Sequence, residues 1–287
     1  MDIGVGLPTG IPGVDGRLAV GWAAQAEQGP FASLDVIDRL AYDSYDPLIA
    51  LAAAASVTER LRLATTILTA PLRPTVPLAK QLASLHQLSG GRLVVGVGVG
   101  AREDDYELAG APHRGRGRRL DDQLVEFISI FERDGVGLRT SVLGRPTLLA
   151  GGTSGRALAR MARYTDGYIH GGGPPRVFAR AVEEARAAWH DAGRPGTPQL
   201  WGQAYFAFGD GAAAGEEYLR HYYAFTGAFA DKIAAGLLTS PSQLIEFVHA
   251  YEEAGCRHLC LLPAVADRSQ LDALAECLAP VVVGGGR

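Results

Sequence analysis

The chain has 287 residues, of which 47% are hydrophobic and 20% are charged, and its formal net charge is −4. This length falls within the range of a single α/β barrel, so we expect one domain over residues 1–287. The nearly balanced charge leaves no excess of basic residues of the kind that binds nucleic acid. Residues 1–8 carry no basic segment and too short an apolar run for a signal peptide or a membrane span, which predicts a cytoplasmic protein without membrane contact.

Eight short β-rich runs alternate with helical patterns along the chain. This alternation predicts an α/β fold in the form of a (β/α)8 TIM barrel. Several runs are apolar at successive residues, as in parallel strands whose outer side is covered by helices. The predicted strands are 3–7, 34–37, 61–68, 93–98, 146–150, 167–170, 200–208 and 258–262. The predicted helices are 18–28, 47–58, 76–88, 118–131, 156–164, 175–192, 242–254 and 270–278.

Two of these helices begin at caps that contain proline. Asp46 precedes Pro47, and Ser240 precedes Pro241. A side-chain oxygen just before a proline at the first helical position is typical of a helix start. Both pairs support the helices predicted there.

A loop is inserted after the fourth strand, over residues 100–117. It is polar, rich in glycine and arginine, and longer than most βα loops. Because it follows a strand at the end of the barrel where active sites form, we expect it to act as a lid or a substrate loop.

The three cysteines lie close together near the end of the chain. On a strand, Cys256, His258 and Cys260 would share one face and would offer metal ligands. A fourth ligand at a recognisable spacing is missing, so we predict no metal site. We interpret the cysteines as small core residues and His258 as a strand residue.

Glycines follow the fifth and sixth predicted strands. Gly151, Gly152 and Thr153 come just before a predicted helix, and Gly171 and Gly172 follow the next strand. Backbone N–H groups beside a helix N-terminus favour an anion such as a phosphate. A tight βα turn needs the same glycines, and this alternative stays open.

The segment 85–100, Leu-His-Gln-Leu-Ser-Gly-Gly-Arg-Leu-Val-Val-Gly-Val-Gly-Val-Gly, resembles the bacterial luciferase-like oxidoreductase family. Further stretches resemble the family in the same order, at 46–65, 79–81, 118–121, 149–154 and 162–169. Beyond about residue 180 the resemblance rests only on the β/α pattern. It implies a luciferase-like barrel that binds coenzyme F420 or FMN at the carboxyl ends of its strands.

The resemblance also implies which residues touch the cofactor. In similar proteins the ring rests on a bulged third strand with a cis peptide bond, and Thr66 and Ile67 hold the matching positions. Gly98 and Val99 lie at the end of the fourth strand and are further cofactor contacts that the resemblance implies. Asp38 is a further cofactor contact, with a solvated carboxylate as the equal alternative. The phosphate would lie at Gly151, Gly152, Thr153, Gly171 and Gly172.

The acid–base residues of the relatives do not carry over. Family members often have Asp-His after the second strand, where this chain has Asp38 and Arg39, and Ala101 replaces an acid of some deazaflavin-dependent relatives. The remaining candidates for proton transfer lie near strand exits: Asp38, Tyr42 and His170. A packed or solvent-facing histidine is the alternative reading of His170.

These observations predict an oxidoreductase that transfers hydride between coenzyme F420 and a small organic substrate, because residues 66–71 and 98–100 look closer to deazaflavin-dependent relatives. One alternative is an FMN-dependent monooxygenase; either cofactor implies a separate flavin or F420 reductase as a partner. Another alternative is a non-catalytic flavin-binding protein. Similar proteins are commonly dimers, so we expect a homodimer.

Two other barrel enzymes are disfavoured. An aldolase needs a lysine inside the barrel, and the only lysines, Lys80 and Lys232, fall in helical patterns. A metal hydrolase barrel usually carries His-x-His on a strand, and the sequence has no such pair.

Overall fold

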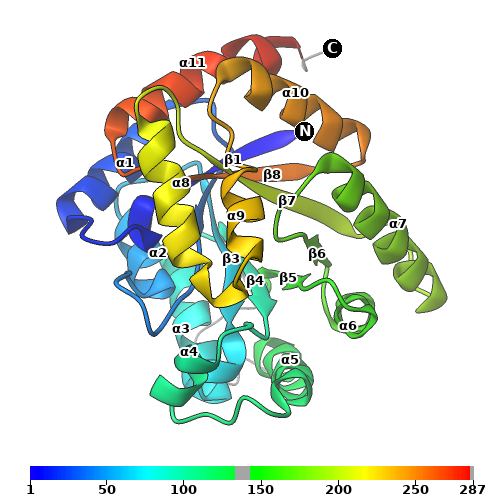
Figure 1. Cartoon of the computed structure of the whole chain (residues 1–287). Helices are drawn as coiled ribbons and strands as arrows, with labels where there is room; N and C mark the ends of the chain where they lie inside the picture. The colour runs from blue at the N-terminus through cyan, green and yellow to red at the C-terminus, as the bar shows by residue number, and fades with distance from the viewer. Residues whose placement is uncertain (133–142, 285–287) are drawn as a thin grey trace.

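The computed structural model describes residues 1–132 and 143–284. Eight parallel strands close into a barrel in chain order, and the last strand pairs with the first (Figure 1). The predicted fold class is therefore confirmed. The strands are β1 (Asp2–Gly6), β2 (Ser33–Val36), β3 (Arg62–Thr69), β4 (Leu93–Gly98), β5 (Thr147–Gly151), β6 (Gly167–Ile169), β7 (Gln199–Phe206) and β8 (His258–Pro263).

Helices surround the barrel, and all eight predicted helices are present with ends that differ by a few residues. These are α1 (Gly16–Gln28), α2 (Pro47–Ala55), α3 (Thr75–Leu88), α5 (Arg116–Glu132), α6 (Gly155–Tyr164), α7 (Pro175–Asp191), α10 (Pro241–Glu253) and α11 (Arg268–Gly284). The cap predictions are confirmed as well. The Asp46 side chain accepts the N–H groups of Leu48 and Ile49 at 2.9 and 3.1 Å, and the Ser240 side chain accepts that of Gln243 at 3.4 Å.

Three α-helices of the described residues lie outside the prediction. The first, α4 (Glu103–Leu108), belongs to the loop after β4, and α8 (Gly211–Tyr222) and α9 (Phe229–Ala234) lie between β7 and β8. The predicted seventh strand was too long, because β7 ends at Phe206 and residue 208 already belongs to the turn before α8. The start of α8 has no side-chain cap, and the glycines at 211 and 215 offset the helix propensity of the three alanines between them. In Figure 1, α8 and α9 cross in front of the barrel strands.

The interior of the barrel is filled by side chains. Because side chains alternate along a strand, outward-facing residues pack against the helices and inward-facing residues form a separate cluster. The inward cluster consists of Ala64, Val94, Leu149, Ile169, Trp201 and Cys260, with Ile67 packed against it. In barrels of this kind the interior is a packed core, and ligands bind at the carboxyl ends of the strands.

Within residues 1–132 and 143–284, every helix falls short of the length or apolar character that a membrane crossing requires.

Candidate functional site

The side chain of Ile67 forms a ridge at the carboxyl end of the barrel. The pairing of β3 with β4 shifts between Thr65 and Leu68, and the Thr66–Ile67 peptide bond inside this irregularity is cis, as the resemblance implied. Ile67 is half-buried, whereas Thr66 and Leu68 beside it are buried. The ridge therefore presents apolar surface toward the opening of the barrel.

Three glycines make room for this ridge. A Cβ atom on Gly98 would lie 2.5 Å from Ile67 Cδ1, and one on Gly151 would lie 3.0 Å from Ile67 Cγ2. A Cβ atom on Gly96 would lie 2.3 Å from the carbonyl oxygen of Thr65. Gly98 and Gly151, both predicted as cofactor contacts, are thus placed directly against Ile67. Their missing side chains set the shape of the floor of the site.

Replacing Gly98 by alanine is expected to displace the Ile67 side chain. The added methyl group would overlap Ile67 Cδ1, and overpacking of this kind costs about 1–3 kcal/mol. Urea unfolding should show the loss, and Gly98→Ala combined with Ile67→Ala should recover part of it. The matched control is Gly155→Ala, where nothing lies within 4 Å of the new atom and the stability should not fall. Equal stability of Gly98→Ala and wild type would contradict the contact.

Asp38 lies just beyond β2, and its side chain binds the residues at the carboxyl end of β3. Its carboxylate accepts the backbone N–H of Thr69 at 2.8 Å and two N–H groups of Arg73 at 2.6 and 3.0 Å. The Asp38 side chain is only 1% exposed. All of these donors belong to the segment that follows Ile67, so we interpret Asp38 as a residue that positions this segment.

The inserted loop after β4 is fastened to the exit of β2. Asp105 of α4 accepts the backbone N–H groups of Leu40 and Ala41 at 3.0 and 2.7 Å, and its carboxylate lies 3.2 Å from Arg39 Nε. Arg39 also pairs with Asp104 at 2.9 Å. The arginine that stands where relatives have histidine is therefore neutralised by the loop. A lid function for the loop stays a prediction.

An aromatic wall borders the opening on the side of α8. The Arg102 guanidinium lies 4.3 Å from the ring centres of Tyr222 and Phe225, and it donates to the backbone oxygen of Tyr222 at the end of α8. Tyr42, a candidate for proton transfer, bonds through its hydroxyl to His221 Nδ1 at 2.8 Å. The exits of β2 and β4 are thereby both joined to α8.

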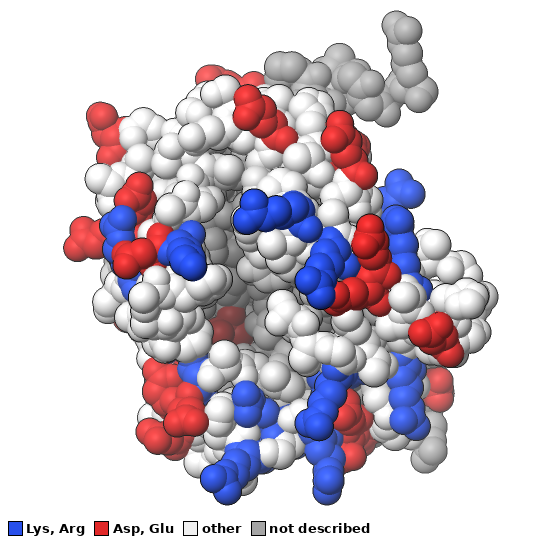
Figure 2. Space-filling model, turned by 45° about the vertical axis from the view of Figure 1, so that its right-hand side comes forward, with Lys and Arg blue, Asp and Glu red and all other residues white. Residues whose placement is uncertain are grey.

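The glycine-rich exits of β5 and β6 lie open at the same end of the barrel. Gly152, Thr153 and Gly171 are exposed, and Gly172 is half-buried. Gly152 and Gly172 have φ values of 123° and 95°, which a residue with a Cβ rarely adopts. Ser154 caps α6, whose other first-turn N–H groups lack partners within the helix. This end of α6 suits an anion. Figure 2 shows a hollow near the centre of its face, with basic and acidic side chains interspersed around it.

The family described as "Luciferase-like monooxygenase" matches residues 1–255. The chain belongs to this family. An uncharacterized protein of Mycobacterium tuberculosis is 33% identical to it over 206 residues, which cover 60% of this chain and 71% of that protein.

Two solved structures share the luciferase-like fold over nearly the whole chain. An F420-dependent secondary alcohol dehydrogenase in complex with an F420–acetone adduct has a TM-score of 0.81 and 17% identity, and the match covers 98% of this chain and 99% of that chain. The oxygenating constituent of 3,6-diketocamphane monooxygenase of Pseudomonas putida, in complex with FMN, has a TM-score of 0.76 and 16% identity, with 99% of each chain covered. Identities this low show the common fold.

In this luciferase-like barrel, His170 lies on the helix side of β6. Its ring meets those of Tyr168 and Phe178 edge-on, with ring centres 6.1 and 5.8 Å apart, and both aromatic residues belong to the outward-facing core. His170 is 3% exposed, and burial lowers its pKa. The structure brings Asp38 and Tyr42 to the opening but places His170 away from them as a packed, neutral histidine.

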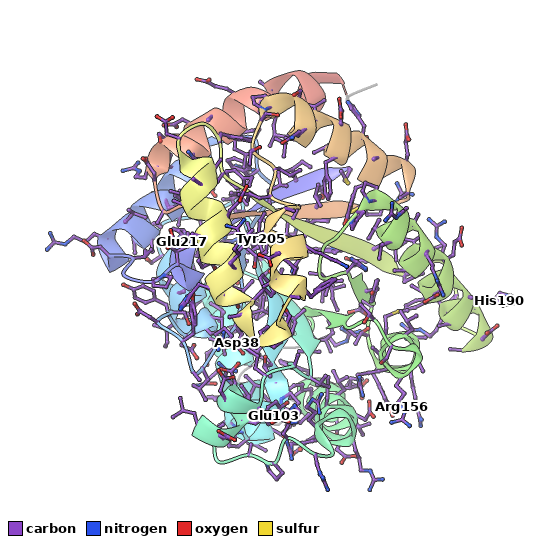
Figure 3. All side chains as sticks on the ribbon, in the orientation of Figure 1. Asp38, Glu103, Arg156, His190, Tyr205 and Glu217 are labelled. Atoms are coloured by element: carbon purple, nitrogen blue, oxygen red, sulfur yellow. The ribbon has the colours of Figure 1, made fainter. Side chains whose placement is uncertain are left out.

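Two inward-facing residues of β7 were missed by the sequence interpretation. Tyr205 lies near the middle of the barrel behind α8 and α9 (Figure 3), and its hydroxyl is 3.0 Å from that of Tyr223. Burial raises the pKa of both phenols, so both stay protonated. One of the two hydroxyl protons forms the hydrogen bond between the phenols, and the other hydroxyl proton can be donated to a further acceptor. The second residue is Gln203. Trp201 points into the barrel, and because alternate residues of a strand share one face, Gln203 and Tyr205 point inward as well.

At the amino end of the barrel, a buried polar network links β2 and β8. Ser33 Oγ lies 3.0 Å from each carboxylate oxygen of Asp35 and 2.8 Å from His258 Nε2, while Arg62 donates to His258 Nδ1 at 2.9 Å. Because a guanidinium only donates, His258 carries its proton on Nε2 and donates to Ser33, which in turn donates to Asp35. Each member has a partner.

The structure confirms His258 as a strand residue and Cys256 and Cys260 as buried core residues, but Cys256 does not share a strand face with the other two. Strand β8 begins at His258, so Cys256 precedes it and packs in the outward-facing core. Inside the barrel, the third residue beside His258 and Cys260 is Asp35 and not Cys256. Atoms of Asp35, His258 and Cys260 that could bind a metal lie within 4.8 Å of one another.

A groove of about 700 Å³ also opens at the amino end, between the ends of α1, α2 and α3. Glu27 in its wall accepts the backbone N–H of Arg60 at 2.7 Å, and Arg92 donates to the carbonyl oxygen of Thr58 at 2.7 Å. These side chains tie neighbouring turns together, so we place the candidate site at the other end of the barrel.

Proposed function

We propose that the chain is an oxidoreductase that holds the ring of coenzyme F420 against Ile67 and transfers hydride to or from a small organic substrate. The observation that carries this proposal is the half-buried Ile67 ridge, which packs against Gly96, Gly98 and Gly151 at the opening of the barrel. A flat tricyclic ring can lie on such an apolar ridge, and a bound cofactor of this kind would donate or accept the hydride.

The surrounding residues fit a cofactor of this kind. Asp38 and Arg73 hold the strand exit next to the ridge. The open turns at Gly152 and Gly171, with the N-terminus of α6 beside them, offer N–H groups to a phosphate. The aromatic wall of α8 limits the entry of water on the opposite side, and a drier site strengthens polar contacts to a substrate.

The main alternative is an FMN-dependent monooxygenase that receives reduced flavin from a separate reductase. The structural likeness to the FMN-bound oxygenating constituent of 3,6-diketocamphane monooxygenase supports it, whereas the likeness to the F420-dependent alcohol dehydrogenase supports the lead proposal. The sequences of residues 66–71 and 98–100, which look closer to deazaflavin-dependent relatives, favour F420.

A parallel titration tests the choice. The purified protein is titrated with F420 and with FMN, and binding is followed by fluorescence. We expect F420 to bind at least tenfold more tightly, which corresponds to about 1.4 kcal/mol. Tight binding of FMN alone would favour the monooxygenase, and binding of neither would overturn the proposal. Binding of F420 without turnover of any alcohol, ketone or aldehyde would favour a non-catalytic cofactor-binding protein.

A further inference from the structure

The side-chain amide oxygen of Gln203 is buried without a partner. Gln203 is 7% exposed, and its Oε1 atom is fully covered and makes no hydrogen bond to any residue that the structure describes. Buried polar groups in native proteins are nearly always hydrogen-bonded, and an unmet one lowers stability. An exception of this kind, kept inside a barrel, points to a ligand that meets the amide.

The amide lies at the level where a ligand would sit. The last residue of β6, Ile169, pairs with Trp201 of β7, so Gln203, two residues further along, has passed the end of β6. Its backbone lies beside the open turn, since a Cβ atom on Gly172 would be 3.0 Å from the Gln203 carbonyl oxygen. On the same face of β7 the next residue toward the opening is Tyr205, whose hydroxyl lies 3.0 Å from that of Tyr223.

The charged side chains at the exits of β2 and β4 have partners of their own. Asp38 is paired with Arg73 at 2.6 Å, and Arg39 with Asp104 and Asp105 at 2.9 and 3.2 Å. The Arg102 guanidinium is stacked on aromatic rings and bonded to the end of α8. Arg156 lies toward the outer side of α6 in Figure 3, away from the barrel axis. Among the residues that the structure describes, Gln203 and Tyr205 offer a neutral amide and a neutral phenol on the inner face of β7.

We propose that Gln203 binds and orients the substrate, and that the substrate is a neutral molecule whose reacting carbon carries a hydroxyl or carbonyl oxygen. The amide N–H donates to this oxygen in the carbonyl form, and the amide oxygen accepts the hydroxyl proton in the alcohol form. A carboxylate or sulfonate beside these two neutral groups would lose its hydration and gain no ion pair from them. This inference rests on the proposed oxidoreductase function.

The first test needs no substrate. Thermal unfolding of Gln203→Met without ligand is expected to have a midpoint about 2–4 °C above wild type, because an unmet polar group is replaced by an apolar one of similar size. The matched control is Gln123→Met. Gln123 Oε1 is likewise buried without a partner, but the amide N–H groups of Gln123 donate to the carbonyl oxygens of Ala70 and Arg73 at 3.2 and 2.8 Å, so loss of these two bonds should lower the midpoint. A lower midpoint for Gln203→Met would show a structural role and overturn the proposal.

The second test uses the protein loaded with whichever cofactor binds. The probes are 2-propanol with acetone and cyclohexanol with cyclohexanone, compared with acetate and ethanesulfonate. We expect turnover of a neutral pair, and Gln203→Met should lower kcat/KM about tenfold or more while the cofactor Kd changes less than twofold. Preference for the anions, no turnover of the neutral compounds, or an unchanged kcat/KM in the variant would each overturn the proposal. If neither cofactor binds, the oxidoreductase function fails, and the unfolding midpoints still decide whether the Gln203 amide is kept at a cost in stability.

Discussion

Replacing Asp38 by asparagine is expected to lower the free energy of unfolding by about 3 kcal/mol, because it breaks a buried ion pair and leaves the other charge behind. The Asp38 side chain is 1% exposed, and Arg73, which is 16% exposed, would keep only its contact with the half-exposed Asp46 at 3.1 Å. The loss should appear as a lower midpoint of urea unfolding at neutral pH. The same variant should weaken cofactor binding about tenfold, because the N–H of Thr69 and the segment after Ile67 lose their anchor.

The control for this prediction is an exposed ion pair. Arg180 and Glu184 on α7 lie 2.9 Å apart with side chains 81% and 44% exposed, so Glu184→Gln should change the stability by no more than about 0.5 kcal/mol. If Asp38→Asn were as mild as this control and yet abolished turnover, Asp38 would be a proton acceptor and not a positioning residue. If Asp38 is a positioning residue, Asp38→Asn should lose stability and cofactor affinity together, and its activity should fall in proportion.

The barrel itself was predictable because its signals are local. Each βα unit carries a short apolar run, a turn with glycine or proline, and a helical pattern, and eight such units suffice for closure. The Asp46 and Ser240 caps were predictable for the same reason, since a cap depends on three or four neighbouring residues. The segment between β7 and β8 lacked such signals, and α8 and α9 were missed.

The site was only partly predictable, because it depends on which face of each strand points inward. A strand that is apolar at every residue does not show which of its side chains point into the barrel. His170 fell on the outer face and Gln203 on the inner face, although both stand near strand exits. The glycines were recognised, but the reason for Gly98 and Gly151 is the Ile67 side chain, a contact between strands that sequence spacing cannot show.

Replacing Asp35 by asparagine is expected to change how stability depends on pH. Burial raises the pKa of Asp35 to about 7, even though Ser33, Cys260 and Arg62 lower it. In the unfolded chain an aspartate has a pKa of about 3.9. The folded protein therefore favours the protonated carboxyl: its contribution is fully present below about pH 4 and is lost as the pH rises to about 7. The total loss over this range is about 4 kcal/mol.

Asparagine has nearly the shape of aspartate and keeps an oxygen to accept the Ser33 hydroxyl, but it does not titrate. Urea unfolding of wild type and Asp35→Asn at pH 5, 6, 7 and 8 should therefore give curves that diverge, with the variant gaining relative stability as the pH rises. Because the network lies at the amino end of the barrel, the variant should keep its affinity for the cofactor. Parallel pH curves for the two proteins would show that the carboxyl titrates normally and would contradict the prediction.

Asp166 supplies a control of opposite sign. Burial alone would raise its pKa, but hydrogen bonds from Arg145 and from the Leu148 N–H lower it below the usual value. Its contribution to stability is therefore present above about pH 4 and is lost only at lower pH. Asp166→Asn should be less stable than wild type by a constant amount between pH 5 and 8, whereas the difference for Asp35→Asn should change with pH. A pH-dependent difference in Asp35→Asn alone would assign the titration to the barrel interior rather than to the surface charge of the whole protein.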